Sequence, residues 1–488
     1  MSQPIEQVLG MWSDGPGPLH RKLSDALRHA AGSGRLRVGQ RLPSERDLAG
    51  RLAVSRSTVV TAYDTLRSEG VVESRQGSGT RVAAGGGDGG PRPDALGDFT
   101  VSPIYRTLID ARDDVISLAC ATFPAHPRVA EAMAAVVADD GEKLLVHTGY
   151  MPAGLPALRR ALADMLTGDG TPTTPDQILV TTGAQQAVTL ATLLLVRPGD
   201  EVVVETPSFS GTLDVFRTRG ARVTAVPVDD EGVDARQVAR AVDAGRPAAV
   251  YVMPTYHNPT GVLLAAHRRR DLAELAAERG VAVIEDNALA SAPLDDSPVP
   301  PLVAGFAPPD APVLSAGSFS KAAWGGLRVG WLRGPVPLIA RLTELKAMND
   351  LGSPLFDQAV AARLVPHLPS MRADHRRMLT RNLALVGDLL ATMLPTWRWQ
   401  RPMGGPSLWV ELPTGSASAF SQAALRFGVE VIPGDQMSPT GDDRAHLRLP
   451  YTAEPTVLDE TMRRLAQAWQ AYAPTESLGP PPPRPVVV

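Results

Sequence analysis

Residues 315–328 read SAGSFSKAAWGGLR, and this stretch decides the interpretation of the chain. It sets Lys321 beside hydroxyl side chains, with Arg328 seven residues later. Lys321 is the only lysine between Lys143 and Lys346 in a chain that otherwise uses arginine for positive charge. Only a deprotonated amine attacks an aldehyde to form a Schiff base, and burial lowers the pKa of a lysine towards that state. The stretch therefore indicates a reactive amine close to serines and an arginine that can bind a phosphate.

Short apolar runs along the chain predict the strands of a mainly parallel sheet. They are nearly continuously apolar, which suits strands that are buried on both faces. Amphipathic stretches such as AAHRRRDLAELAAERG (265–280) alternate with them. Alternating strands and helices favour an α/β fold over residues 99–470. The runs are QILVTTG (177–183), DEVVVETP (200–207), AAVYVMP (248–254) and VAVIED (281–286).

Polar residues follow these predicted strands at their carboxyl ends, where open α/β sheets bind ligands. The segment TTGAQQA (181–187) turns from a strand into a helix, so its backbone N–H groups can form an anion site. Asn258 in TYHNPTG follows another strand. Asp286 ends VAVIED, and a buried carboxylate there costs several kcal/mol unless it has a partner. A protonated pyridine nitrogen would serve as that partner.

The first 83 residues have a different pattern, which predicts three short helices and a hairpin. Apolar residues share one face of a helix over 19–31. Ser44 is the predicted N-cap of a second helix, and Ser55 caps a third helix that stops before Gly70. The segment VVESRQGSGTRV (71–82) then predicts two strands around a Gly-rich tip.

Two short helices joined by a tight turn form the helix-turn-helix arrangement, and the hairpin after them would be its wing. At the start of the third helix the predicted inward face leaves Arg56, Ser57, Thr58 and Val60 outside. Charge agrees with a DNA-binding head, because residues 1–83 carry 12 Lys and Arg against 8 Asp and Glu. The remainder carries 36 against 44.

The head resembles the GntR-type winged helix over roughly residues 17–83. The segments LPSERDLA, VSRSTVVTAYDTLRSEG and SRQGSGT match the pattern of that family. Any single exposed arginine in the head could instead be merely solvated. The resemblance implies double-stranded DNA as a partner, with contacts from Arg46, Ser55, Arg56, Ser57, Thr58, Gln76 and Gly77.

The rest of the chain resembles fold-type I aminotransferases, which bind pyridoxal phosphate (PLP), over about residues 115–470. The motifs of this family occur here in the family's order. They are GAQQA, an aromatic in ETPSFSG, HNPTG, ED, SFSK and LRL. Together with the head, they resemble the MocR subfamily of GntR-type regulators. By this resemblance Lys321 forms the Schiff base with PLP and Asp286 pairs with the pyridine nitrogen. Asn258 bonds the ring hydroxyl, Phe209 stacks on the ring, and Arg448 would bind the α-carboxylate of an amino acid. The expected effector is a small amino acid or an amine. The implied phosphate ligands are Gly183, Ala184, Gln185, Ser318, Ser320 and Arg328.

Some of these residues have plainer interpretations, and two positions depart from the family. Phe209 could belong to the core, Asn258 could shape a turn, and Arg448 could be structural. The tyrosine that usually stands two residues after the aspartate is Ala288 here. Tyr150 is displaced by one residue from the usual family tyrosine, so it receives no role. Loss of a phenol beside the Schiff base argues against turnover more than against PLP binding.

These observations predict a winged helix-turn-helix at 17–83, a linker at 84–98, an aminotransferase-like domain at 99–470 and a Pro-rich tail at 471–488. The preferred hypothesis is a PLP-dependent transcription regulator. The alternatives are an active aminotransferase with a DNA-binding head, and a repressor whose second domain has lost PLP and only dimerises. The resemblance implies a head-to-tail, domain-swapped homodimer. Without a signal sequence, a long apolar run or a cysteine cluster, we expect a cytoplasmic protein with no metal site.

Overall fold

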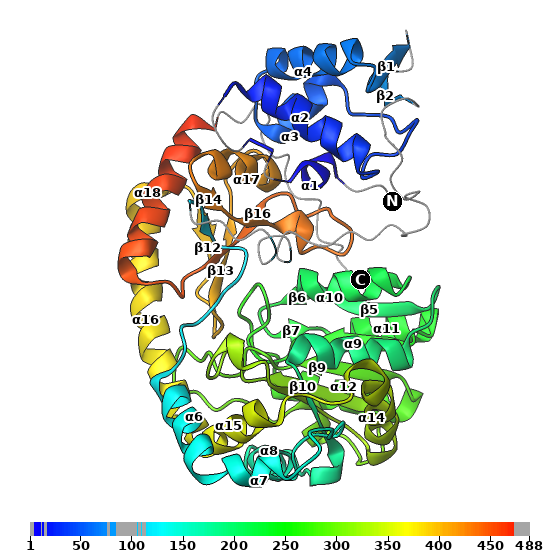
Figure 1. The fold of residues 1–488 in the computed structure, drawn as a ribbon, viewed down its shortest axis with the longest axis vertical. Coiled ribbons are helices and arrows are strands. Elements are labelled where there is room, and N and C mark those ends of the chain that lie inside the picture. Colours follow the sequence, from blue (N-terminus) through cyan, green and yellow to red (C-terminus); the bar gives the residue numbers. More distant parts are fainter. Residues whose placement is uncertain are drawn as a thin grey trace.

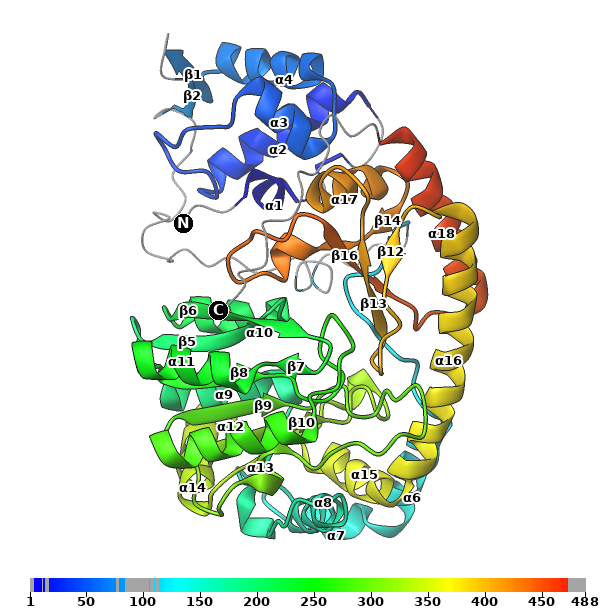
Figure 2. The same ribbon diagram turned by 180° about the vertical axis from the view of Figure 1, so that it is seen from behind.

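We describe a computed structural model of the chain that places residues 4–10, 12–13, 17–75, 79–83, 105, 109 and 114–472. The predicted linker at 84–98 and residues 473–488 of the predicted tail lie outside these described residues. Figures 1 and 2 show a small head, a C-terminal lobe beneath it, and a large lobe on the far side of the C-terminal lobe. In the described part of the chain, no helix is both long and apolar enough to cross a membrane.

The head has the predicted helices and hairpin, and two serines fix the helix starts. The side chain of Ser44 accepts a hydrogen bond from the Asp47 amide, and that of Ser55 accepts one from the Thr58 amide, both at 3.2 Å. These bonds confirm both predicted N-caps, each of which satisfies an otherwise unpaired amide. The elements are α1 (Ile5–Leu9), α2 (Leu19–Gly32), α3 (Glu45–Leu52), α4 (Arg56–Ser68) and the antiparallel pair β1 (Val72–Arg75) and β2 (Gly79–Val82).

The head has its own apolar core, to which α1 also contributes. Tyr63 is buried at the centre, and its hydroxyl donates to the Pro43 carbonyl at 2.9 Å. Ile5 and Trp12 pack into the same cluster, so the folded head includes residues before the predicted boundary at 17. The other large members of this core are Leu23, Leu27, Leu48, Leu52, Val59 and Leu66.

The large lobe is built on an eight-stranded sheet with the strand order β4-β11-β10-β9-β8-β5-β6-β7. Neighbouring strands from β10 to β6 are parallel, whereas β11 runs against both of its neighbours. The sheet is therefore mainly parallel, as predicted. Its strands are β4 (Ile178–Thr181), β5 (Glu201–Thr206), β6 (Arg222–Asp229), β7 (Gly232–Val233), β8 (Ala249–Val252), β9 (Ala282–Asp286), β10 (Val313–Ser318) and β11 (Gly330–Arg333).

Helices cover both faces of this sheet, which explains why its strands are continuously apolar. One face packs on α9 (Ala184–Leu195), α10 (Ser210–Thr218) and α14 (Val336–Asp350). The opposite face packs on α11 (Ala235–Gly245), α12 (Ala266–Arg279) and α13 (Val303–Phe306). At the β4 edge lie α6 (Pro127–Asp139), α8 (Pro156–Gly168) and α15 (Leu355–Leu364). The short helices of this lobe are α7 (Gly141–Leu145), η2 (Pro175–Gln177), η3 (Gly325–Leu327) and η4 (Val365–His367).

The C-terminal lobe joins the large lobe through the long helix α16 (Leu368–Met393), which runs along one side of both (Figures 1 and 2). Its antiparallel sheet has the order β12-β13-β16-β15. An aromatic cluster of Trp397, Phe420 and Trp469 holds its helices together. Its elements are β12 (Arg398–Trp399), β13 (Ser407–Glu411), α17 (Ala417–Arg426), β15 (Ile432–Pro433), η5 (Gly434–Gln436), β16 (His446–Pro450), α18 (Pro455–Ala471), and β14 (Val429–Glu430) paired with β3 (Ile116–Ser117).

Candidate functional site

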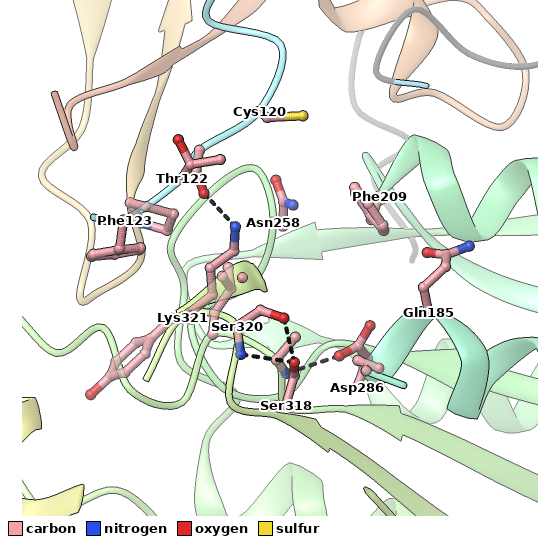
Figure 3. Close-up of a pocket in the computed structure, with 18 of the residues that line it drawn as sticks. Cys120, Thr122, Phe123, Gln185, Phe209, Asn258, Asp286, Ser318, Ser320 and Lys321 are labelled. Atoms are coloured by element: carbon pink, nitrogen blue, oxygen red, sulfur yellow. Dashed lines mark hydrogen bonds between the residues drawn. The ribbon is translucent and has the colours of Figure 1, made fainter. Parts of the chain in front are cut away.

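A pocket of about 610 Å³ lies between the large lobe and the C-terminal lobe. That volume is in the usual range for small-molecule sites. Every residue that the sequence predicts for PLP or an effector lines this pocket, although these residues span more than half of the chain (Figure 3). They are Gly183, Ala184, Gln185, Phe209, Asn258, Asp286, Ser318, Ser320, Lys321, Arg328 and Arg448.

One end of the pocket is a cradle suited to a phosphate. Gly183 precedes α9 with φ of 128°, a conformation that favours glycine. A Cβ at Gly183 would lie 3.5 Å from Nη2 of Arg328 and 3.8 Å from Oγ of Ser318, so a guanidinium and a hydroxyl converge there. The Ser318 hydroxyl also donates to that of Ser320 at 2.9 Å. The amide groups at the start of α9 add further donors, and this combination binds anions.

Lys321 follows β10, and its amine points across the pocket towards the segment that carries Thr122 and Phe123 (Figure 3). Its Nζ donates to the Ala121 carbonyl. Burial of the amine in the pocket lowers the pKa of Lys321 to about 8. About a tenth of Lys321 is therefore uncharged at pH 7, far more than for an exposed lysine, and attack on an aldehyde requires this form.

Asp286 ends β9 and holds its carboxylate on the pocket wall with two hydrogen bonds. Its Oδ1 accepts from the Ala288 amide at 2.9 Å, and its Oδ2 accepts from the Tyr251 hydroxyl at 3.0 Å. The hydroxyl of Thr212 in turn donates to the Tyr251 oxygen at 3.1 Å. Burial raises the pKa of Asp286, and within the described residues this carboxylate has no ion-pair partner. A cationic ring nitrogen would provide one, so the site fits the predicted pyridine contact.

Arg448 lies on β16 at the opposite wall and is only 2% exposed. Its Nη1 donates to Oδ1 of Asn258 at 3.4 Å, and its Nη2 donates to the Ala119 carbonyl. Burial lowers the pKa of Arg448 to about 10. Its Nε is buried and has no hydrogen-bond partner among the described residues. A buried guanidinium with a spare donor is suited to a carboxylate.

Phe209 and Gln185 occupy the remaining wall. Phe209 is the residue before α10 and is partly buried, with its side chain near the pocket (Figure 3). Gln185 donates from Nε2 to the Gly211 carbonyl at 3.2 Å, so its side chain is engaged by the protein. Any contribution of Gln185 to a phosphate would therefore come from its backbone at the start of α9.

Several residues of the pocket had no signal in the sequence. Tyr105 donates to the Gly211 carbonyl at 3.3 Å, and Cys120, Phe123, Tyr256 and Trp324 also line the pocket. Tyr256 and Trp324 lie within the segments TYHNPTG and SAGSFSKAAWGGLR but received no role from the sequence, and no motif marks Tyr105, Cys120 or Phe123, which packing between distant segments brings here. Tyr251 could have been suspected only from its place in the buried strand before HNPTG.

The two positions that depart from the aminotransferase pattern lie in different surroundings. Ala288 lines the pocket beside Asp286, where it provides no phenol. Tyr150 is 68% exposed and does not line the pocket.

The predicted DNA contacts gather at the start of α4 and on α3. Arg46, Ser55 and Ser57 are exposed, and the side chain of Arg56 is 69% exposed while it lies 3.6 Å from Glu45. The hydroxyl of Thr58 is 2.8 Å from that of Ser55 and is only partly exposed. Figures 1 and 2 show α4 on the side of the head that faces away from the C-terminal lobe. The predicted contacts Gln76 and Gly77 lie outside the described residues.

Comparisons with known proteins match both parts of the chain. The family "Aminotransferase class I and II" matches residues 115–468, and "Bacterial regulatory proteins, gntR family" matches residues 19–82. The chain is 32% identical over 452 residues to the uncharacterized HTH-type transcriptional regulator YisV of Bacillus subtilis (strain 168), covering 89% of this chain and 92% of that protein. It is 29% identical over 339 residues to the probable rhizopine catabolism regulatory protein MocR of Rhizobium meliloti, covering 67% of each.

A solved structure also resembles the large and C-terminal lobes. It is LysN, the alpha-aminoadipate aminotransferase of Thermus thermophilus, complexed with N-(5'-phosphopyridoxyl)-L-leucine. The TM-score is 0.69 at 28% identity, covering 78% of this chain and 97% of that chain.

Proposed function

Because the chain belongs to the MocR-type regulators, in which a gntR-family head precedes a class I and II aminotransferase domain, we propose that it is a DNA-binding transcription regulator that senses PLP. One observation carries the proposal. The reactive amine of Lys321, the carboxylate of Asp286 and a phosphate cradle converge on one pocket, in the same chain as a helix-turn-helix whose recognition helix faces outwards.

In the proposed complex, different residues of the pocket bind different parts of the cofactor. PLP supplies an aldehyde that an amine can attack and a ring that withdraws electrons. Lys321 would provide the uncharged amine for covalent attachment. The negative charge of Asp286 would stabilise the protonated ring nitrogen. Asn258 faces the ring hydroxyl, and Phe209 covers the ring. The phosphate is held by the cradle of Gly183, Ala184, Gln185 (through its backbone), Ser318, Ser320 and Arg328.

Arg448 is the proposed site for the carboxylate of a small amino-acid effector. The spare Nε of Arg448 and the contact of its Nη1 with Asn258 would link effector binding to the cofactor. A ligand can change DNA binding only if its affinity differs between two arrangements of the protein. We therefore propose that occupancy of this pocket shifts the population of head positions.

On DNA, the start of α4 would enter the major groove, with Arg56, Ser57 and Arg46 facing bases and phosphates. A homodimer would read two half-sites about one helical turn apart or multiples of it. The sequence predicts that the two heads are exchanged between subunits. In the single chain described here, Arg426 of the C-terminal lobe contacts the Leu52 and Ala53 carbonyls of the head.

The second candidate function is an active aminotransferase with an appended head. The complete set around Lys321 and the phosphopyridoxyl-leucine bound to LysN favour it. Ala288 opposes it, because no phenol stands beside the amine at that position. The exposed recognition-helix start also has no use in transamination.

The test is a titration of the purified protein with PLP, with the absorbance of the attached cofactor and DNA mobility recorded together. We expect an absorbance band that parallels a change in DNA binding in the wild type. Lys321→Ala should lose the band, whereas Lys143→Ala, at a lysine that is 80% exposed, should keep it. A band of unchanged intensity in Lys321→Ala would refute the assignment. A silent wild type would favour a domain that only dimerises, and sustained turnover of an amino acid would favour the aminotransferase.

A further inference from the structure

A buried ion pair lies where α14 packs on α9, and neither of its members lines the pocket. Lys346 on α14 is fully buried. Its Nζ donates to Oδ1 of Asp350, one turn further along the helix, at 2.8 Å and to Oδ2 at 2.6 Å. Burial by itself would raise the pKa of Asp350, but hydrogen bonds from Lys346, Gln186 and the Gly352 amide lower it below its ordinary value. The carboxylate is therefore ionised at neutral pH and balances the charge of the buried amine.

Gln186 connects this ion pair to the phosphate cradle. It lies in the first turn of α9, which begins directly after Gly183. Its Nε2 donates to Oδ2 of Asp350 at 2.7 Å, and its Oε1 accepts from Nζ of Lys346 at 3.3 Å. The same Oε1 accepts from the Thr182 amide at 2.9 Å. Thr182 is the residue before Gly183, so the ion pair fixes the peptide that enters the phosphate-binding turn.

The orientation of this turn decides whether the cradle can hold an anion. Gly183 has φ of 128°, and its carbonyl accepts from the Thr181 hydroxyl at 3.0 Å, so the turn is held at a second point. The amides of Ala184 and Gln185 are in the first turn of α9, where amides have no acceptor within the helix. They can donate to a phosphate only if the turn directs them towards the space beside Arg328. A small rotation of the turn would therefore weaken the phosphate contacts and leave the rest of the pocket in place.

Stability alone does not explain why this site holds an ion pair. The removal of two charges from water is costly, and a well-packed apolar pair of similar volume is often at least as stable. The Gly352 amide donates to Oδ1 of Asp350 at 3.0 Å, so the carboxylate receives donors from α9, from α14 and from the segment after α14. Donors from three segments fix the orientation of the carboxylate, and Gln186 transmits that orientation to the turn. The network is therefore suited to fixing geometry.

We propose that Gln186, Lys346 and Asp350 are positioning residues that set the phosphate-binding turn, and that they make the pocket select phosphorylated PLP over unphosphorylated pyridoxal. This inference rests on the proposed function, because it concerns the proposed PLP pocket. Without the ion pair, the turn would lose its fixed orientation and the cradle would bind the phosphate less tightly. The contacts with the aldehyde and the ring would remain, because Lys321 and Asp286 are positioned by β10 and β9.

The experiment compares the affinities of the purified protein for PLP and for pyridoxal, each measured by fluorescence titration. In Lys346→Met, which removes the charge but keeps an unbranched side chain, PLP affinity should fall about tenfold and pyridoxal affinity should change less than about twofold. Gln186→Met leaves the ion pair in place but removes the bond to the Thr182 amide, so it should also lose affinity for PLP alone. Arg341→Ala is the control, because Arg341 is an exposed cation on the same helix as Lys346. It should leave both affinities unchanged.

The double variant tests whether both residues act through the same turn. If they do, Lys346→Met combined with Gln186→Met should lose about as much PLP affinity as the larger of the two single losses. Multiplied losses, equal losses for PLP and pyridoxal in Gln186→Met, or no loss for either compound, would overturn the proposal while leaving PLP sensing intact. If the thermal melting curve shows that Lys346→Met does not fold, Gln186→Met alone decides the result. A wild type that binds neither compound would reject the proposed PLP pocket, and this inference with it.

Discussion

The head and the pocket present their functional groups in opposite ways. In the head, Arg46, Arg56 and Ser57 are exposed, close in sequence, and positioned by caps that belong to the same two helices. In the pocket, Lys321 and Arg448 come from separate lobes and have pKa values lowered by burial. Exposed groups contact their ligand from solvent and act several at a time, so each contributes a modest share of the binding free energy. Buried groups interact more strongly because the pocket excludes water, so the substitution of a single residue has a large effect on ligand binding.

The largest expected effect is on the pH dependence of PLP attachment. With a pKa of about 8, the uncharged fraction of Lys321 falls tenfold for each pH unit below that value. The attachment rate, followed by stopped-flow absorbance, should therefore rise about 100-fold between pH 6 and pH 9 and then level off. A lysine-containing peptide serves as the control, because its rate should keep rising above pH 9. A protein rate that also keeps rising would mean that the pocket does not desolvate the amine.

The next effect concerns the buried carboxylate. Asp286→Asn keeps the shape but removes the charge that would face the ring nitrogen. PLP affinity, measured by fluorescence titration, should fall by about 2–3 kcal/mol, on the order of 30- to 150-fold. Asp310→Asn, at an exposed position, is the matched control and should be silent. Equal affinities for the two variants would remove Asp286 from the cofactor site.

In the head, single changes should be smaller and should depend on position. Arg56→Ala should weaken specific operator binding by about 1–3 kcal/mol in a mobility-shift titration. Arg67→Ala, in the last turn of the same helix and paired with Asp64, is the control for a general loss of charge. If both variants lost the same affinity for DNA, Arg56 would contribute only to the general electrostatic attraction of the head to DNA and not to recognition of the base sequence.

The smallest effect should come from the residue that supports Asp286. Tyr251→Phe removes the hydroxyl that donates to Oδ2 of Asp286, and this donor lowers the pKa of the carboxyl group. PLP affinity should fall by about 1 kcal/mol, roughly fivefold. In addition, the pKa of Asp286 rises in the variant, so the loss of affinity on acidification should begin at a higher pH than in the wild type. An unshifted acid limb would show that Tyr251 only fills space.

Local patterns were enough to predict the head and the strands of the large lobe. Ser44 and Ser55 act within three residues of themselves, so their caps could be read from the sequence and are present. The apolar strand runs reflect burial on both faces of the sheet. Such burial requires apolar residues at consecutive positions, so it can also be predicted from neighbouring residues. The pocket residues could be assigned to one site because Asp286 and Asn258 lie at the carboxyl ends of parallel strands, and such ends meet at one edge of a sheet.

The contacts that complete the site could not be predicted in this way. Tyr251 meets Asp286 because β8 lies next to β9, and Ala119 meets Arg448 across more than 300 residues. Arg426 has the same side chain as every other surface arginine until the head packs on it. Such contacts depend on tertiary packing, which leaves no periodic trace in the neighbouring residues.

Helix α16 has a mechanical consequence for the whole molecule. Its 26 residues form a rod about 39 Å long that joins the two lobes flanking the pocket. A tilt of about 5° at its large-lobe end would displace the other end by about 3 Å, close to the rise of one base pair in DNA. Because α18 packs on α16 and α17 packs on α18, that displacement would be passed to the head. If the proposed regulation holds, a helix of this length would convert a minor rearrangement around a small ligand into a displacement of about one base-pair step at the head.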